Sequence, residues 1–246
     1  LRTNLHDDAS LRFCIVRALA RLRREQPRLV FERERAESAA LRRLRAWRHY
    51  RPMAQDLAAS GRFGLLHRAV AERVDQNLQA SLVYLSLVHE AEPLRRALEG
   101  LRAGAWLDAI ELIDVALEGR PIRRPVLELL EAPMPAPDAG RAEAHLASLE
   151  RGRDRVLALI AHETSKRWGW AEEETLRPAP GTEGEASMSR ALIDKVFVLE
   201  EVQLFRGLSV DDLAAVAELC DEAHAPPGHV FYRQGEPGDA LFVIVT

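Results

Sequence analysis

Apolar residues recur at helical spacing between residues 65 and 87, and this pattern constrains the fold more than any other. Leucines and valines occur there every three or four residues, with polar side chains between them. In an α-helix such positions share one face, and a stripe of this length is buried against other helices. The stripe consists of Leu66, Val70, Val74, Leu78, Leu82 and Leu85. We therefore predict a core built from packed helices.

The same spacing in other stretches predicts a mainly α chain. Most of these stretches are bounded by glycine, proline or capping residues, which begin and end helices. Pro52 lies inside one of them and is expected to kink or split it. Ser209 and Asp212 form a capping-box pattern before the last helix. The predicted helices cover residues 10–24, 32–60, 65–87, 93–102, 105–117, 121–131, 142–168, 189–199 and 209–220.

Composition divides the chain into four predicted parts. Residues 1–131 alternate short helices with Gly or Pro corners, which is typical of an α-solenoid. Residues 132–171 contain a proline-rich loop and a further helix. Residues 172–190 are acidic, rich in Gly and Pro and poor in apolar side chains, which predicts a linker. Residues 191–246 are expected to form the last domain.

The end of the chain predicts strands. The β-rich runs 229–233 and 240–245 flank residues 234–239, which contain two glycines, a proline and an aspartate, as a turn between strands does. A final apolar strand without a neighbour would leave an open sheet edge. We therefore expect the sequence to be a fragment of a longer protein.

Residues 191–246 resemble the N-terminal part of a cyclic nucleotide-binding domain. The resemblance rests on the run Phe205-x-Gly-Leu-Ser209, a short helix, the run from Gly228 to Asp239 and the strand from Leu241 to Ile244. It implies a truncated C-terminal β-roll of the jelly-roll type after the helical part.

The resemblance also implies where a nucleotide would bind. In that family a Phe-Gly-Glu helix start and an arginine meet the cyclic phosphate, and both would lie beyond Thr246. We therefore expect no cofactor-binding residue and no cofactor in this fragment, while cyclic AMP or cyclic GMP is the ligand implied for the complete protein. The turn residues are interpreted as structural, because glycine supplies positive φ and aspartate bonds to the backbone. They are Gly228, Gly235, Glu236, Gly238 and Asp239.

Two runs of the helical part, Leu11 to Leu19 and Leu107 to Asp114, resemble HEAT repeats, which are armadillo-like α-solenoids. More narrowly, it is similar to the cytosolic HEAT-like region of bacterial ADP/ATP translocase-like proteins, where that region follows a transporter domain and precedes a cyclic nucleotide-binding domain. This implies a regulatory protein, the cytosolic part of a membrane transporter, whose repeats bind its own transporter domain or another protein. The alternative is a nucleotide-insensitive interaction scaffold. The residues that carry the resemblance are Arg12, Phe13, Arg17 to Leu19, Leu22, Arg23, Ala109 to Asp114 and Leu127 to Leu130.

Charge is distributed unevenly along the chain. Residues 1–51 contain 14 Arg against 6 acidic residues, whereas residues 171–246 contain 5 basic and 15 acidic residues. The basic region predicts solvated helix faces or contact with an anionic membrane surface, and no motif points to nucleic acid. The candidate membrane-contact residues are Arg2, Arg12, Arg17, Arg21, Arg23, Arg24 and Arg28.

No motif predicts catalysis. His162 and Glu163 begin a zinc-protease pattern, but Lys166 occupies the place of the second histidine and cannot bind zinc, so these are predicted to be surface residues. We expect no enzyme, no catalytic residue and no metal ligand. No apolar run approaches the ~20 residues of a membrane span, and no signal peptide is evident, so the expected location is the cytoplasm or the cytosolic face of a membrane.

Overall fold

The structure, a computed structural model, describes residues 9–26, 28–169, 183–235 and 240–245. These residues form ten α-helices and two short 3-10 helices, so the predicted mainly α class is confirmed. The chain divides into two compact units, residues 1–145 and residues 146–246. We describe each unit by itself.

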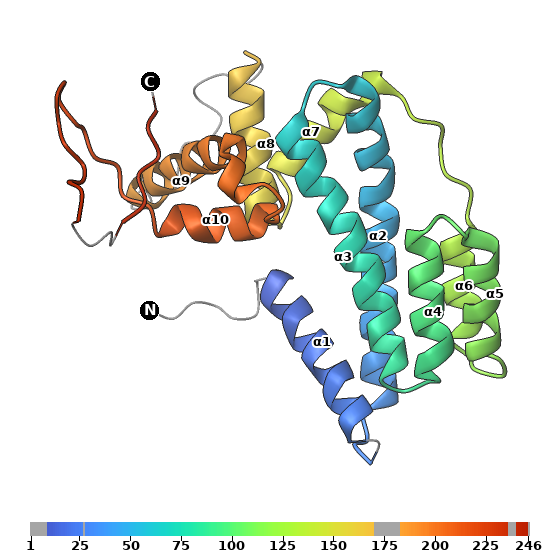
Figure 1. The fold of residues 1–246 in the computed structure, drawn as a ribbon. Coiled ribbons are helices and arrows are strands. Elements are labelled where there is room, and N and C mark those ends of the chain that lie inside the picture. The colour runs from blue at the N-terminus through green and yellow to red at the C-terminus, as the bar shows by residue number, and fades with distance from the viewer. Residues whose placement is uncertain (1–8, 27, 170–182, 236–239, 246) are drawn as a thin grey trace. The chain divides into compact units, whose positions relative to one another are not determined.

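The first unit is built from six helices that match the predicted spans to within two residues at each end. The long helices α2 and α3 pack against each other, and α1 lies on α3 (Figure 1). The short helices α4 and α5 pack together, α4 also packs on α3, and α6 contacts α2 and α5. The bounds are α1 (Ala9–Glu25), α2 (Arg33–Ser60), α3 (Gly64–Ser86), α4 (Ala91–Arg102), α5 (Trp106–Ala116) and α6 (Arg123–Glu131).

Proline does not split the longest helix. Pro52 lies inside α2, which continues to Ser60 and ends at Gly61 with a φ of 63°. Proline removes one intrahelical hydrogen bond, but packing along α3 holds the helix on both sides of it. Of the two expected outcomes, the split does not occur, and the kink stays a prediction.

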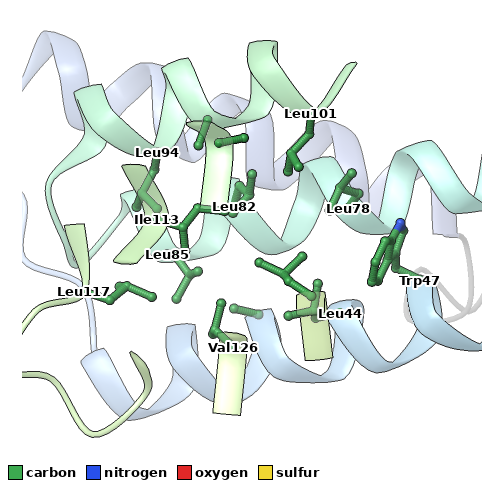
Figure 2. Close-up of a cluster of buried hydrophobic side chains, with 14 of the residues drawn as sticks. Leu44, Trp47, Leu78, Leu82, Leu85, Leu94, Leu101, Ile113, Leu117 and Val126 are labelled. Atoms are coloured by element: carbon green, nitrogen blue, oxygen red, sulfur yellow. The ribbon is translucent and has the colours of Figure 1, made fainter. Parts of the chain in front are cut away.

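One buried cluster joins α2 to α6 and forms the core of the first unit (Figure 2). Fully burying a leucine or isoleucine contributes about 1.5–3 kcal/mol, so the cluster is the main stabilising feature of the unit. It includes three members of the predicted stripe, Leu78, Leu82 and Leu85. Its other residues are Ala40, Leu44, Trp47, Leu94, Ala97, Leu101, Ala109, Ile113, Leu117, Ile122, Val126 and Leu130.

The proline-rich loop after α6 is held to α2 by a buried carboxylate. Asp56 is 1% exposed and accepts a hydrogen bond from the backbone N–H of Asp138 at 2.7 Å. Nε and Nη2 of Arg141 donate to its two oxygens at 2.9 and 3.0 Å, and Nε2 of His145 lies 2.8 Å from Oδ2. These contacts fix the short 3-10 helix η1 (Ala139–Arg141) against α2.

Two arginines of α2 are held by groups that carry no charge. Nη1 of Arg48 donates to the carbonyl oxygen of Ala132 at 2.6 Å. The Arg51 guanidinium lies 5.0 Å from the ring centre of Trp47 and 4.3 Å from that of Trp106, and the two indoles stack 5.9 Å apart. Burial, and then the nearby Arg48 guanidinium, lower the pKa of Arg51 below its ordinary value. Both side chains thus stabilise the fold without an ion pair.

The single helix predicted over residues 142–168 is wrong, because the structure has two helices there. α7 (Ala142–Glu150) ends before Gly152, and α8 (Arg155–Arg167) begins after Asp154, whose side chain accepts from the backbone N–H of Leu157 at 3.2 Å. A Cβ at Gly152 would lie 2.9 Å from the Leu149 carbonyl oxygen, so this turn needs glycine. No apolar side chain lies between Leu149 and Val156, but their spacing of seven residues keeps the helical phase across the break, which concealed it.

The second unit continues with α9 (Glu183–Glu201), η2 (Gln203–Phe205) and α10 (Val210–Glu218). α9 begins earlier than the predicted residue 189, within the stretch expected to be a linker. Residues 172–182 of that linker lie outside the described residues.

The strands predicted at 229–233 and 240–245 are not formed. The described residues after α10 have neither helix nor strand, as Figure 1 shows. An isolated two-stranded ribbon is marginal in water, because each strand needs further neighbours to satisfy its backbone groups. The β-roll therefore stays a prediction, and so does the solenoid arrangement of the helical part.

Candidate functional site

The segment from α9 to residue 245 is the candidate site, because it contains the residues that suggested nucleotide binding. A capping box begins the helix α10 of this segment, as predicted. The Ser209 hydroxyl accepts from the Asp212 backbone N–H at 3.1 Å, and the Asp212 carboxylate accepts from the Ser209 N–H at 3.3 Å. α9 packs against α10, and both have buried apolar faces. These residues are Ile193, Val196, Leu199, Val210, Leu213 and Ala217.

Three further contacts fix α9, and the sequence did not reveal them. Nζ of Lys195 donates to the Cys220 carbonyl oxygen at 2.6 Å, which joins α9 to the chain after α10. The Arg167 guanidinium lies 3.7 Å from the ring centre of Phe197 and donates to Asp194 at 3.4 Å. The partners in these pairs are 25 to 30 residues apart, so no local pattern could have identified them.

The two runs that were predicted as strands lie side by side through their aromatic side chains. The Phe231 and Phe242 rings are 4.7 Å apart, and the Tyr232 and Phe242 rings are 5.3 Å apart. The Tyr232 hydroxyl also donates to the Ala240 carbonyl oxygen. The two runs are therefore in contact, although no ladder of backbone hydrogen bonds joins their described residues.

Two of the five predicted turn residues can be placed. Gly228 has a φ of 83° and Gly235 a φ of 90°, values that other residues rarely adopt. Glu236, Gly238 and Asp239 lie outside the described residues. The two glycines thus have the backbone conformation that a turn role requires, and their role in a β-roll stays a prediction.

This segment leaves apolar side chains in water. Val230 is 60% exposed, Leu241 64% and Ile244 74%. Further strands or a partner would cover such residues in a complete sheet. The described part of the segment therefore offers apolar surface that a partner can cover.

Some arginines at the start of the chain form ion pairs or hydrogen bonds within the first unit. Arg21 pairs with Glu25 at 2.8 Å, and Arg23 donates to the Leu29 carbonyl oxygen. Arg24 and Arg28 are exposed, as is Arg17. Arg2 lies outside the described residues, and the side chain of Arg12 is not described either. A common contact face for all seven arginines is therefore a prediction.

The described residues also limit other kinds of site. None of their helices is long and apolar enough to cross a membrane. No group of three or more His, Cys, Asp or Glu side chains in the described ranges could hold a metal ion. His162 and Glu163 are buried, which corrects their prediction as surface residues, and His162 Nδ1 lies 3.9 Å from Glu150 Oε1.

Comparison with known proteins finds short similarities to two kinases. The chain is 44% identical over 46 residues to the cGMP-dependent protein kinase egl-4 of Caenorhabditis elegans, and 41% identical over 46 residues to that of Caenorhabditis briggsae. The match covers 19% of this chain and 6% of each kinase, so the chain spans a small part of these relatives. No family model and no solved structure matches the chain.

Proposed function

We propose that this chain belongs to a regulatory protein in which a cyclic nucleotide-binding region is joined to a helical scaffold. The observation that carries the proposal is the 46-residue similarity to kinases that depend on cGMP. The capped helix α10 and the positive φ of Gly228 and Gly235 support it, because they agree with the turns of the resembled domain. The protein acts by binding and not by catalysis.

The helical part would act as a HEAT-like scaffold. Paired helices with a continuous core support this role, because such pairs present broad surfaces to a partner. The partner is the protein's own transporter domain, as in the translocase-like proteins, or another protein. The location that follows is the cytoplasm or the cytosolic face of a membrane.

A nucleotide-insensitive scaffold is the second candidate, and a segment exchange separates the two. In the exchange, the matched 46 residues of this chain replace their counterparts in the C. elegans kinase. If the segment is a working part of a cyclic nucleotide-binding region, the chimera keeps cGMP-stimulated kinase activity. The matched control carries the same 46 residues in scrambled order. A folded chimera whose kinase activity does not respond to cGMP would contradict the cyclic nucleotide-binding function and favour the nucleotide-insensitive scaffold.

The 246-residue chain by itself should not bind cyclic nucleotides measurably, because it contains no Phe-Gly-Glu cassette. Calorimetric titration with cAMP and with cGMP checks this prediction. Binding in the micromolar range would place a cyclic nucleotide site among residues outside the family's pattern.

The arginine-rich start supports a further proposal, namely contact with an anionic membrane. Each well-placed basic residue contributes about 1 kcal/mol near anionic headgroups. Replacing Arg24 and Arg28 by Gln should reduce co-sedimentation with phosphatidylserine vesicles at low salt. The control replaces Arg96 and Arg153, which are also exposed. Equal binding by both variants would contradict a role for Arg24 and Arg28.

A further inference from the structure

The middle of α2 carries an unbalanced positive charge. Between Ser38 and Gln55 the helix contains five arginines and no aspartate or glutamate. Neighbours one turn away therefore cannot form the usual intrahelical ion pairs. The five are Arg42, Arg43, Arg45, Arg48 and Arg51.

Structural roles explain only part of this charge. Arg48 binds a loop carbonyl and Arg51 stacks on two indoles, as described above. Arg43 donates to the Asn77 side-chain oxygen at 3.3 Å. Arg42 and Arg45 are exposed, and no ion pair with a described residue holds either of them.

Arg42 and Arg43 line a hollow between α2 and α3. Its other lining residues are Ala39 and Tyr84. The alanine leaves space above the helix, and the lining contributes two guanidinium groups and a phenol hydroxyl but no carboxylate. All of these polar groups can donate hydrogen bonds to an anion.

A neighbouring amide orients one of the guanidinium groups. Asn77 is 5% exposed, and its Nδ2 donates to the Arg73 carbonyl oxygen one turn earlier at 2.7 Å. This bond directs the amide oxygen of Asn77 toward Arg43. The guanidinium at the hollow is therefore held in place before any ligand arrives, which lowers the entropy cost of binding.

We propose that this hollow binds a phosphate monoester. Two guanidinium groups match the charge of such a group, which is about −1.5 to −2 at neutral pH, and their planar forks fit phosphate oxygens. The Tyr84 hydroxyl would donate a third hydrogen bond. The phosphate comes from a soluble metabolite or from a lipid headgroup, since the chemistry is the same. This site is separate from the C-terminal segment and does not depend on the proposed cyclic nucleotide function.

Titration of the 246-residue chain with inorganic phosphate, followed by ³¹P line broadening, tests the site. Arg42→Gln should weaken binding about tenfold, because it removes a charge-assisted hydrogen bond. Arg45→Gln is the matched control, since it removes the same charge from the same helix outside the hollow. Tyr84→Phe should weaken binding by a smaller factor with little effect on folding. Equal weakening by Arg42→Gln and Arg45→Gln, or no phosphate binding, would overturn the proposal.

The source of the phosphate is decided by two further probes. Glycerol 3-phosphate should compete with inorganic phosphate if the ligand is soluble. Phosphatidylcholine vesicles should retain the chain only when they contain phosphatidylinositol 4-phosphate, and Arg42→Gln should lose this retention, if the ligand is a lipid. Failure of both probes while sulfate binds equally well would reject a phosphate site.

Discussion

Asp56 is a buried carboxylate, and its hydrogen-bond partners stabilise the ionised form. Burial alone would raise the pKa of this carboxyl, but the hydrogen bonds from Arg141, His145 and the Asp138 backbone outweigh it and hold the pKa below its usual value. Since every donor comes from residues 138–145, the carboxylate joins α2 to a segment more than 80 residues away in sequence. Its loss should therefore affect folding of the whole first unit.

Asp56→Asn should destabilise the first unit by about 1–3 kcal/mol at pH 7, because Arg141 and His145 lose a charged acceptor. The folded pKa is lower than the unfolded one, so the carboxylate's contribution is complete above the unfolded value near 4 and is lost as the pH falls through the folded one. Urea unfolding at pH 7 and near pH 3 measures the difference. The control is Asp75→Asn, an exposed residue of α3. Equal effects of the two variants would show that Asp56 is not a structural anchor.

A contact between His89 and Glu37 holds the start of α2 to the turn between α3 and α4. Nε2 of His89 lies 2.9 Å from Oε1 of Glu37, and the imidazole is almost completely buried. Burial lowers the pKa of His89, Glu37 opposes this effect, and Arg33 and Arg120 add to it, so the net direction is down. The neutral imidazole is thus the form that the fold favours.

Stability should therefore decrease as the medium becomes acidic. In the unfolded chain the histidine binds a proton near pH 6.5, whereas in the folded chain its pKa is lower. The unfolded state is therefore stabilised relative to the folded one as the pH falls through this range. His89→Gln keeps a hydrogen-bonding side chain without this titration, and its unfolding free energy should change less between pH 7 and about pH 5.5. His49→Gln, on the exposed side of α2, should retain the wild-type slope. The comparison uses guanidinium unfolding at matched ionic strength, and identical slopes for both variants would contradict the prediction.

Local patterns predicted most helices because the information lies within one or two turns. The stripe from Leu66 to Leu85 gave α3 to within one residue at each end, and Ser209 gave the start of α10. The break at Gly152 was missed because Leu149 and Val156, seven residues apart, stay in helical phase on either side of it. The strands at 229–233 and 240–245 were predicted wrongly for a different reason, since a strand depends on neighbours that can lie anywhere in the chain.

In the candidate sites, too, the sequence predicted local conformation but not contacts between residues distant in the chain. Turn chemistry identified Gly228 and Gly235, whose φ angles are positive. The contact of Phe231 with Phe242 could be anticipated from the turn predicted between the two runs. The hollow at Arg42 and Tyr84 could not, because these two residues are 42 positions apart and meet only when α2 packs on α3. A surplus of arginine in α2 was the one signal that the sequence contained.

At the scale of the molecule, the two units should unfold separately. Each has its own buried cluster, with Leu85 at 0% exposure in the first and Leu213 at 0% in the second. Two compact units with separate cores need not unfold in one transition. Substitutions in one unit should then leave the unfolding of the other unchanged, because Leu85 packs in the core of the first unit and Ser209 caps a helix of the second.

Two substitutions in the 246-residue chain test this independence. Leu85→Ala should lower the stability of the first unit by about 2–5 kcal/mol, because it leaves a cavity in the core. Ser209→Ala should lower that of the second by about 1 kcal/mol, because α10 loses its cap. Urea unfolding uses a chain in which Trp168 and Trp170 of the second unit are replaced by Phe. Circular dichroism then reports both units, whereas tryptophan fluorescence reports only Trp47 and Trp106 of the first unit, which separates the transitions. Leu107→Ala, at a side chain that is 84% exposed, controls for the loss of leucine. If Ser209→Ala shifted the transition seen by the tryptophans as much as that seen by circular dichroism, the units would unfold as one.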